Sequence, residues 1–175
     1  MKINRVYANA NHETFKIKPI KKLVDKYVGD GKGWIDPFSG NNSPAEFTND
    51  LNPNTKAKYH LFAQEFIDKL NGYTYKGCIL DPPYSPRQMK EAYNSIGYKP
   101  SMGETQNAKL YMDVKKAIAP KIKSGGYVIT CGWNSYGWGK RFNFSPVEIL
   151  LVCHSSAHND TIVIVEKKIN MELNL

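Results

Sequence analysis

The residues whose types and spacing are best suited to chemistry are Asp81-Pro82-Pro83-Tyr84. The apolar residues 78–80 before them predict a short buried strand, and the two prolines end it because proline lacks an N–H group and fixes φ. The carboxylate of Asp81 and the carbonyl of Pro82 can each accept one N–H of an NH₂ group, while the Tyr84 ring can stack on a base. The run therefore suits a flat heterocycle with an exocyclic amine. It also fits a plain proline turn in which Asp81 makes an Asx-type hydrogen bond.

A second acidic residue ends another predicted strand. Residues 34–36 predict this strand, and Asp36-Pro37-Phe38-Ser39-Gly40 follows. An acidic strand end with a small-residue loop behind it can hold a nucleoside cofactor at the carboxyl edge of a sheet. Short motifs of this kind also occur in structural turns.

These segments occur in an order that resembles a known family. Lys18-Pro19 opens a predicted helix, the loop after Asp36 follows, and Asp81-Pro82-Pro83-Tyr84 comes last. The combination is similar to the S-adenosylmethionine-dependent amino-methyltransferases, which methylate exocyclic nitrogens, most often N6 of adenine in DNA. The resemblance covers roughly residues 15–168.

The resemblance implies a role for each matching residue. The catalytic residues would be Asp81, Pro82, Pro83 and Tyr84, and the residues that bind S-adenosylmethionine would be Phe15, Lys18, Pro19, Asp36, Pro37, Phe38, Gly40 and Asp50. Asp50 stands near the end of a strand predicted over residues 47–51, where an acidic group binds the cofactor ribose. Asn49 is its rival, and an Asx turn before Asn52 is the alternative interpretation. No metal site is expected.

The sequence departs from the family pattern at three places. Asn42 stands where the family has a second glycine, and asparagine tolerates left-handed backbone better than most residues. Asp36 and Asp50 are only fourteen positions apart, so the crossover between their strands should contain a turn in place of a helix. Phe62 stands where the family often has an acidic residue for the cofactor adenine, and we expect it to be a core residue.

The remaining pattern predicts an α/β fold. Helical periodicity marks residues 20–28, 59–70 and 110–122, with Pro120 shortening the last turn, and Ser124-Gly125-Gly126 should end that helix. Strands are predicted over 127–131, 147–153 and 160–166, the last two as an antiparallel hairpin. We therefore expect a Rossmann-like methyltransferase sheet, mostly parallel with a C-terminal antiparallel hairpin. Residues 1–14 should form an N-terminal arm, and residues 15–175 a single methyltransferase catalytic domain.

Composition points to the partner. The 175 residues carry a formal charge of +8, which suits a polyanion because lysine and arginine neutralise phosphates. Aromatic and basic residues within 85–109 and 133–145 could contact nucleic acid or form ordinary loops. Three separated cysteines predict reduced core residues in a cytoplasmic protein, and no apolar run approaches membrane-spanning length. The sequence leaves the oligomeric state open.

Together these features predict an enzyme that methylates the N6 amine of adenine in DNA with S-adenosylmethionine. The target base would be flipped out of the duplex. The alternatives are an RNA base or N4-cytosine methyltransferase, and a non-catalytic nucleic-acid-binding module that keeps a degenerate methyltransferase fold.

Overall fold

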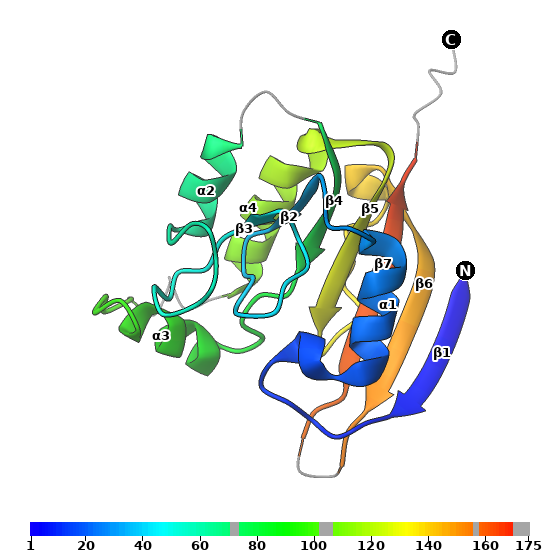
Figure 1. The fold of residues 1–175 in the computed structure, drawn as a ribbon, viewed down its shortest axis with the longest axis horizontal. Helices are drawn as coiled ribbons and strands as arrows, with labels where there is room; N and C mark the ends of the chain where they lie inside the picture. Colours follow the sequence, from blue (N-terminus) through cyan, green and yellow to red (C-terminus); the bar gives the residue numbers. More distant parts are fainter. Residues whose placement is uncertain (71–73, 102–106, 156–157, 170–175) are drawn as a thin grey trace.

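The structure is a computed structural model that describes residues 1–70, 74–101, 107–155 and 158–169. The described residues form one seven-stranded sheet in the order β1-β6-β7-β5-β4-β2-β3 (Figure 1). Its strands are β1 (Lys2–Tyr7), β2 (Trp34–Asp36), β3 (Phe47–Thr48), β4 (Tyr75–Leu80), β5 (Ile122–Gly132), β6 (Phe144–Cys153) and β7 (Thr161–Lys168). The helices are α1 (Lys18–Val28), α2 (Ala63–Lys69), α3 (Pro86–Asn94) and α4 (Asn107–Ile118), with 3₁₀ turns η1 (Thr14–Lys16), η2 (Ala119–Lys121) and η3 (Lys140–Phe142).

The sheet is mostly parallel. β7 runs antiparallel to both of its neighbours, β5 and β6, whereas every other adjacent pair is parallel. The α/β class, the mostly parallel sheet and the C-terminal antiparallel hairpin are therefore confirmed. The crossover from β2 to β3 contains no helix, as its length predicts.

Successive side chains of the central strands point to opposite faces of the sheet, and each face has its own hydrophobic core. Ile79 of β4 packs in the cluster that contains the buried face of α1. Its neighbours Cys78 and Leu80 pack in the other cluster, with α2 and α4. All three cysteines are unpaired and buried. No helix among the described residues has the length and apolar character that crossing a membrane requires.

The N-terminal arm is the largest correction. Residues 2–7 form β1, which pairs in parallel with β6 from Lys2 opposite Glu148 to Tyr7 opposite Cys153. β1 is an edge strand whose residues are all at least partly exposed. It therefore lacks the apolar alternation by which a half-buried strand is recognised.

Other boundaries also differ from the sequence prediction. The second predicted strand is shorter, because only residues 47–48 belong to β3. Gly125 and Gly126 lie inside β5, beside a shift in its register with β4, and do not end a helix. α4 ends at Ile118, and Pro120 lies in the 3₁₀ turn that follows, as a shortened last turn predicts. Residues 85–109, for which the sequence predicted no helix, contain α3, which is capped by Ser85.

Candidate functional site

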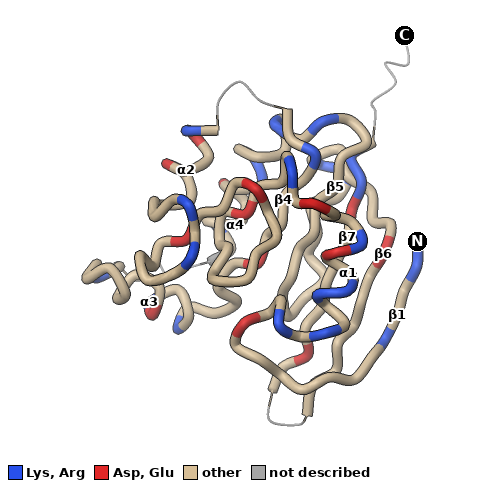
Figure 2. The backbone as a smooth tube through the Cα atoms, viewed as in Figure 1, with Lys and Arg blue, Asp and Glu red and all other residues tan. Residues whose placement is uncertain are grey.

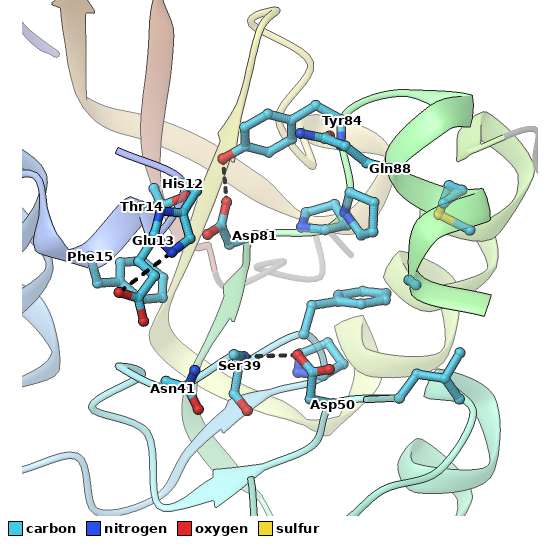
Figure 3. A pocket seen from close by; sticks show the side chains of 18 of the residues that line it. His12, Glu13, Thr14, Phe15, Ser39, Asn41, Asp50, Asp81, Tyr84 and Gln88 are labelled. Carbon is cyan, nitrogen blue, oxygen red and sulfur yellow. Dashed lines mark hydrogen bonds and ion pairs between the residues drawn. The ribbon is translucent and has the colours of Figure 1, made fainter. Parts of the chain in front are cut away.

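The two predicted motifs meet at the carboxyl edge of the sheet. β2 and β4 are parallel neighbours, so the loop after Asp36 and the loop that begins at Asp81 leave the same edge. β3 lies on the far side of β2, and the strand order therefore reverses between β2 and β4, where ligands bind in sheets of this type. A cavity of about 720 Å³ opens there, with residues of both loops in its lining (Figure 3).

All four predicted catalytic residues line this cavity: Asp81, Pro82, Pro83 and Tyr84. Helices hold their loop from two sides. The Tyr111 hydroxyl of α4 donates to the Pro83 carbonyl, and the Tyr84 N–H donates to the Gln88 side chain of α3 over 2.6 Å. No hydrogen bond from the described residues reaches the Pro82 carbonyl.

The Asp81 carboxylate accepts a hydrogen bond from the Tyr84 hydroxyl at its Oδ1 atom. Burial raises the pKa of Asp81 to about 6, although the nearby hydroxyls of Tyr84 and Thr14 favour the charged form and oppose the rise. The Tyr84 ring also meets the half-exposed Trp133 ring edge-on, with centroids 5.6 Å apart. The Asp81 carboxylate thus lies beside Tyr84, whose ring belongs to an aromatic pair.

Asp36 lies beneath the loop that follows it and does not line the cavity. Its side chain is fully buried; Oδ1 accepts the Phe38 N–H over 3.0 Å, and Oδ2 has no hydrogen-bond partner among the described residues. Burial, with smaller contributions from the nearby Asp81 and Asp50 carboxylates, raises the pKa of Asp36 to about 7. The prediction that Asp36 contacts a ligand directly is therefore not supported, because the side chain points under the loop that it shapes.

The other predicted cofactor residues divide into two groups. Phe15, Pro37, Phe38, Gly40 and Asp50 line the cavity. Lys18 and Pro19 are not among its lining residues. They form the first turn of α1, where proline is tolerated because the missing N–H would have no partner in the helix. A direct contact of these two residues with a ligand is not supported.

Asp50 combines the two roles that the sequence left open. Its Oδ2 accepts the Gly40 N–H and its Oδ1 accepts the Asn52 N–H, each over 2.9 Å, so it closes a turn and also faces the cavity. The side-chain amide of Asn49, the alternative candidate, is buried and already has hydrogen-bond partners within the protein. It donates to the carbonyls of Pro37 and Leu61 and accepts the Leu61 N–H. Asp50 therefore remains the better candidate for a ligand contact.

Sequence reasoning missed several lining residues. Ser39 is 4% exposed, and its hydroxyl has no hydrogen-bond partner among the described residues. Phe62 was expected in the core, but it is 38% exposed at the cavity because α2 begins directly after it. Asn42 has no left-handed backbone; its amide donates to Glu13 over 2.5 Å and ties the loop to the N-terminal segment. Ser39 belongs to the recognised motif, so its small polar side chain was the available signal.

The charged side chains that line the cavity are acidic. Its acidic residues are Glu13, Asp50 and Asp81, and among the described residues no lysine or arginine lines the cavity. The histidines His12, His154 and His158 lie in the lining as well, but no group of three or more described His, Cys, Asp or Glu side chains is arranged to hold a metal ion. An acidic cavity in a basic protein suits a cationic small molecule and disfavours a phosphate-rich one.

Comparisons with known proteins agree on the fold. No family model matches the chain, and no curated protein matches it either. Among solved structures, TrmN from Thermus thermophilus has a TM-score of 0.54 at 14% identity over 87% of this chain and 49% of that chain. A putative SAM-dependent methyltransferase from Streptococcus mutans has a TM-score of 0.55 at 13% identity over 85% of this chain and 48% of that chain.

In a third structure, the match extends over a larger share of the other chain. It is the 1,6-didemethyltoxoflavin-N1-methyltransferase of Burkholderia thailandensis, solved with 1,6-didemethyltoxoflavin and S-adenosylhomocysteine, with a TM-score of 0.55 at 12% identity over 87% of this chain and 78% of that chain. The chain spans about half the length of the first two structures. At these identities the likeness concerns the fold: the chain has the Rossmann-like methyltransferase fold.

Proposed function

We propose that this chain transfers a methyl group from S-adenosylmethionine to the exocyclic N6 amine of adenine in DNA. The observation that carries the proposal is the acidic cavity at the reversal point of the sheet, which ends on the Asp81 carboxylate. The fold and the order of the motifs support the same chemistry.

The cavity lining fits the cofactor. S-adenosylmethionine carries a sulfonium and an ammonium group, and when bound it supplies the methyl group on the sulfonium. Glu13 and Asp50 give the lining the opposite charge. Each Asp50 oxygen accepts one backbone N–H and keeps a lone pair for a ribose hydroxyl. The unpaired Ser39 hydroxyl and the exposed Phe62 ring offer a polar and an aromatic contact to the same molecule.

Asp81 and Pro82 would handle the target amine. The carboxylate and the carbonyl can accept its two N–H bonds and thereby turn the nitrogen lone pair toward the part of the cavity lined by Asp50, where the cofactor would bind. Negative charge at Asp81 also stabilises the positive charge that develops on the nitrogen as it is methylated. Asp81 is then the nearest base for the proton that the methylated amine must lose, and its pKa of about 6 suits that exchange near neutral pH.

Tyr84 occupies one position in the structure and would occupy another when a target base is bound. In the structure its hydroxyl donates to Asp81 and its ring leans on Trp133. An amine that takes the place of the phenol on Oδ1 of Asp81 would break this hydrogen bond, and the Tyr84 ring would then move aside as the base enters. Both rings are then available for stacking on the base.

The charge distribution favours a nucleic-acid partner. The protein carries a formal charge of +8, yet the cavity contributes only acidic charge, so the cations lie outside it. Figure 2 shows lysine and arginine along α1, along β1 and around the loop that precedes α2. Exposed Lys56 and Lys58 belong to that loop, and exposed Lys21 and Lys22 to α1. In this proposal, these cations neutralise phosphates while a base enters the acidic cavity.

Transfer of a labelled methyl group tests the function. The wild-type protein is incubated with methyl-labelled S-adenosylmethionine and single-stranded DNA, duplex DNA or RNA, and the digested nucleosides are separated to identify the labelled base. We expect N6-methyladenine from DNA. Asp81→Asn should lower the rate at least 100-fold because the variant loses the charged acceptor, whereas Asp25→Asn on the exposed face of α1 should not change it.

The outcomes separate the alternatives. Label in RNA or at N4 of cytosine would replace the proposed substrate but keep the chemistry. Cofactor binding with no transfer to any nucleic acid would contradict the proposed activity. Nucleic-acid binding without cofactor binding would identify a non-catalytic module.

A further inference from the structure

Gln88 links the first turn of α3 to the loop that begins at Asp81. Ser85 caps the helix, and its Oγ atom accepts the Gln88 N–H over 3.3 Å. The Gln88 side chain folds back in turn, and its Oε1 atom accepts the Tyr84 N–H over 2.6 Å. Figure 3 shows this side chain reaching from α3 toward Tyr84. Two hydrogen bonds therefore fix Gln88 beside the proposed catalytic loop.

This arrangement is close to a capping box but differs from it in one partner. In a capping box, the glutamine or glutamate three residues after the cap residue accepts the backbone N–H of that cap residue. Gln88 accepts instead the N–H of Tyr84, one residue earlier. The next residue, Met89, is 3% exposed and ties this turn of α3 to the protein interior. The carboxamide is therefore held against the backbone of the loop that carries Asp81.

The bond to Tyr84 decides which end of the carboxamide remains free. A backbone N–H can only donate, so the atom that it meets is the oxygen, and the NH₂ group is at the other end. The Nε2 atom of Gln88 has no hydrogen-bond partner among the described residues, and Gln88 lines the cavity together with Asp81. The lining glutamine of α2 differs, because the Nε2 atom of Gln64 donates to Asp68 over 2.9 Å. The Gln88 donors are therefore available to a ligand.

A target amine brings acceptors with it. In adenine the N6 amine lies between two ring nitrogens, N1 and N7, and both are acceptors. Asp81 in its ionised form and the Pro82 carbonyl can hold the amine hydrogens, but they cannot recognise these nitrogens because neither has a hydrogen to donate. No lysine or arginine of the described residues lines the cavity. An amide donor on α3 supplies the complementary group.

We propose that Gln88 is a specificity-determining residue, whose NH₂ group donates to the ring nitrogen beside the target amine. This inference rests on the proposed function. Acceptors for the amine and a donor for the neighbouring nitrogen together match the edge of adenine, and a base without that nitrogen leaves the donor unpaired. The hydrogen bond to Tyr84 keeps the carboxamide from turning its oxygen toward the base, which would repel the nitrogen.

Gln88→Glu separates recognition from capping. Glutamate keeps an acceptor for the Tyr84 N–H and suits the first turn of a helix, so the melting temperature should not fall. It removes both N–H donors. At pH 8, above the Asp81 pKa of about 6, kcat/KM on an oligonucleotide with one adenine should fall roughly tenfold or more. Asn94→Asp makes the same amide-to-carboxylate change on α3 outside the cavity lining, and it should change neither quantity.

Base analogues identify the nitrogen. Oligonucleotides with 1-deazaadenine or 7-deazaadenine have a C–H group in place of N1 or N7 and keep the amine. The wild-type protein should lose roughly tenfold in kcat/KM on one of the two, whereas Gln88→Glu should methylate that analogue at least as well as adenine. Each ratio compares two substrates on one protein, so it does not depend on how much of the variant is folded.

The contrary results are distinct. Equal kcat/KM on adenine for the wild type and Gln88→Glu would leave Gln88 with a capping role and overturn the inference. It is also overturned if the wild type accepts both analogues as well as adenine, or if Gln88→Glu discriminates as strongly as the wild type, since another residue then reads the nitrogen. A wild-type protein that methylates no adenine overturns the proposed function, and the role of Gln88 falls with it.

Discussion

At the scale of single residues, the chemistry depends on whether Asp81 is ionised. Burial raises its pKa to about 6, so the carboxylate loses its charge as pH falls through that value. Since the ionised form is the stronger acceptor for the target N–H and alone can offset positive charge on the nitrogen, we predict that kcat rises with pH between 5 and 7 and then levels off. A pH–rate profile at saturating substrates measures this.

The profile has an internal control. Tyr84→Phe removes a hydrogen bond that favours the charged form of Asp81, so the acidic limb of the remaining activity should move to higher pH. A profile that stays flat from pH 5 to 8, or a limb that Tyr84→Phe leaves in place, would contradict the role of Asp81.

Asp36 provides a stability prediction. Its pKa in the folded protein is about 7, above the ordinary value of 3.8, because the carboxyl group is fully buried. The folded state thus holds this proton more tightly than the unfolded chain, and the stabilisation is complete below about pH 4 and is lost as pH rises through 7. We predict that Asp36→Asn raises the melting temperature at pH 8 by several degrees, about 1 kcal/mol or more, and not at pH 4.

Calorimetric melting at both pH values checks this prediction. Asp68→Asn on the exposed face of α2 is the control and should leave the difference between the two pH values unchanged. If Asp36→Asn destabilises the protein equally at pH 4 and pH 8, Asp36 is not held as a buried charge. The motif predicts that Asp36 contacts the cofactor, but the position of its side chain under the loop depends on packing that the motif does not encode.

At the scale of elements, the segment after β5 is fixed by two buried charges. Lys115 of α4 donates to the carbonyls of Tyr136 and Gly137, and Glu166 of β7 accepts the N–H groups of Trp138 and Gly139. Both side chains are less than 10% exposed. This clamp holds the segment that begins at Trp133 against the sheet, and Trp133 in turn contacts Tyr84.

We predict that Glu166→Gln destabilises the protein by about 1–3 kcal/mol, because the amide group of glutamine places a donor where two backbone N–H groups need acceptors. The melting temperature should fall by several degrees. Glu91→Gln breaks only an exposed ion pair with Arg87 and should have almost no effect. Equal melting temperatures for the two variants would show that the clamp contributes nothing.

Some elements could be predicted from the sequence and some could not. α1 has the apolar spacing of an amphipathic helix, and the strands before the two motifs are short apolar runs that are almost wholly buried, so the sequence predicts them. β1 is a partly exposed edge strand and α3 buries only Met89, so neither has the pattern that a core-facing element requires.

At the scale of the whole molecule, the basic surface and the acidic cavity make separate predictions. Nucleic-acid affinity should fall steeply with salt, because lysines that neutralise phosphates release counterions. We predict that replacing Lys56 and Lys58 together by glutamine makes the slope of log K against log salt shallower by about 2, because two phosphate contacts are lost. Lys123→Gln lies at the start of β5, on the opposite edge of the sheet, and should not change it. Fluorescence anisotropy with a labelled oligonucleotide measures the slope.

The direct tests of this prediction are simple. A slope near zero for the wild type would contradict a phosphate-binding surface. An equal change for Lys123→Gln would move that surface away from the cavity. The formal charge of +8 was visible in the sequence, but the division between a basic exterior and an acidic cavity depends on which loops the sheet order brings together.

Calorimetric titration with S-adenosylmethionine tests the central claim most directly, namely that the cavity is a site for a cationic nucleoside. We predict saturable binding of S-adenosylmethionine, weakened at least tenfold by Asp50→Ala because the variant loses both a charge and the turn that it closes. Nicotinamide adenine dinucleotide, which carries phosphates, should give no binding. Absence of binding by S-adenosylmethionine, or tighter binding of the dinucleotide, would contradict the account.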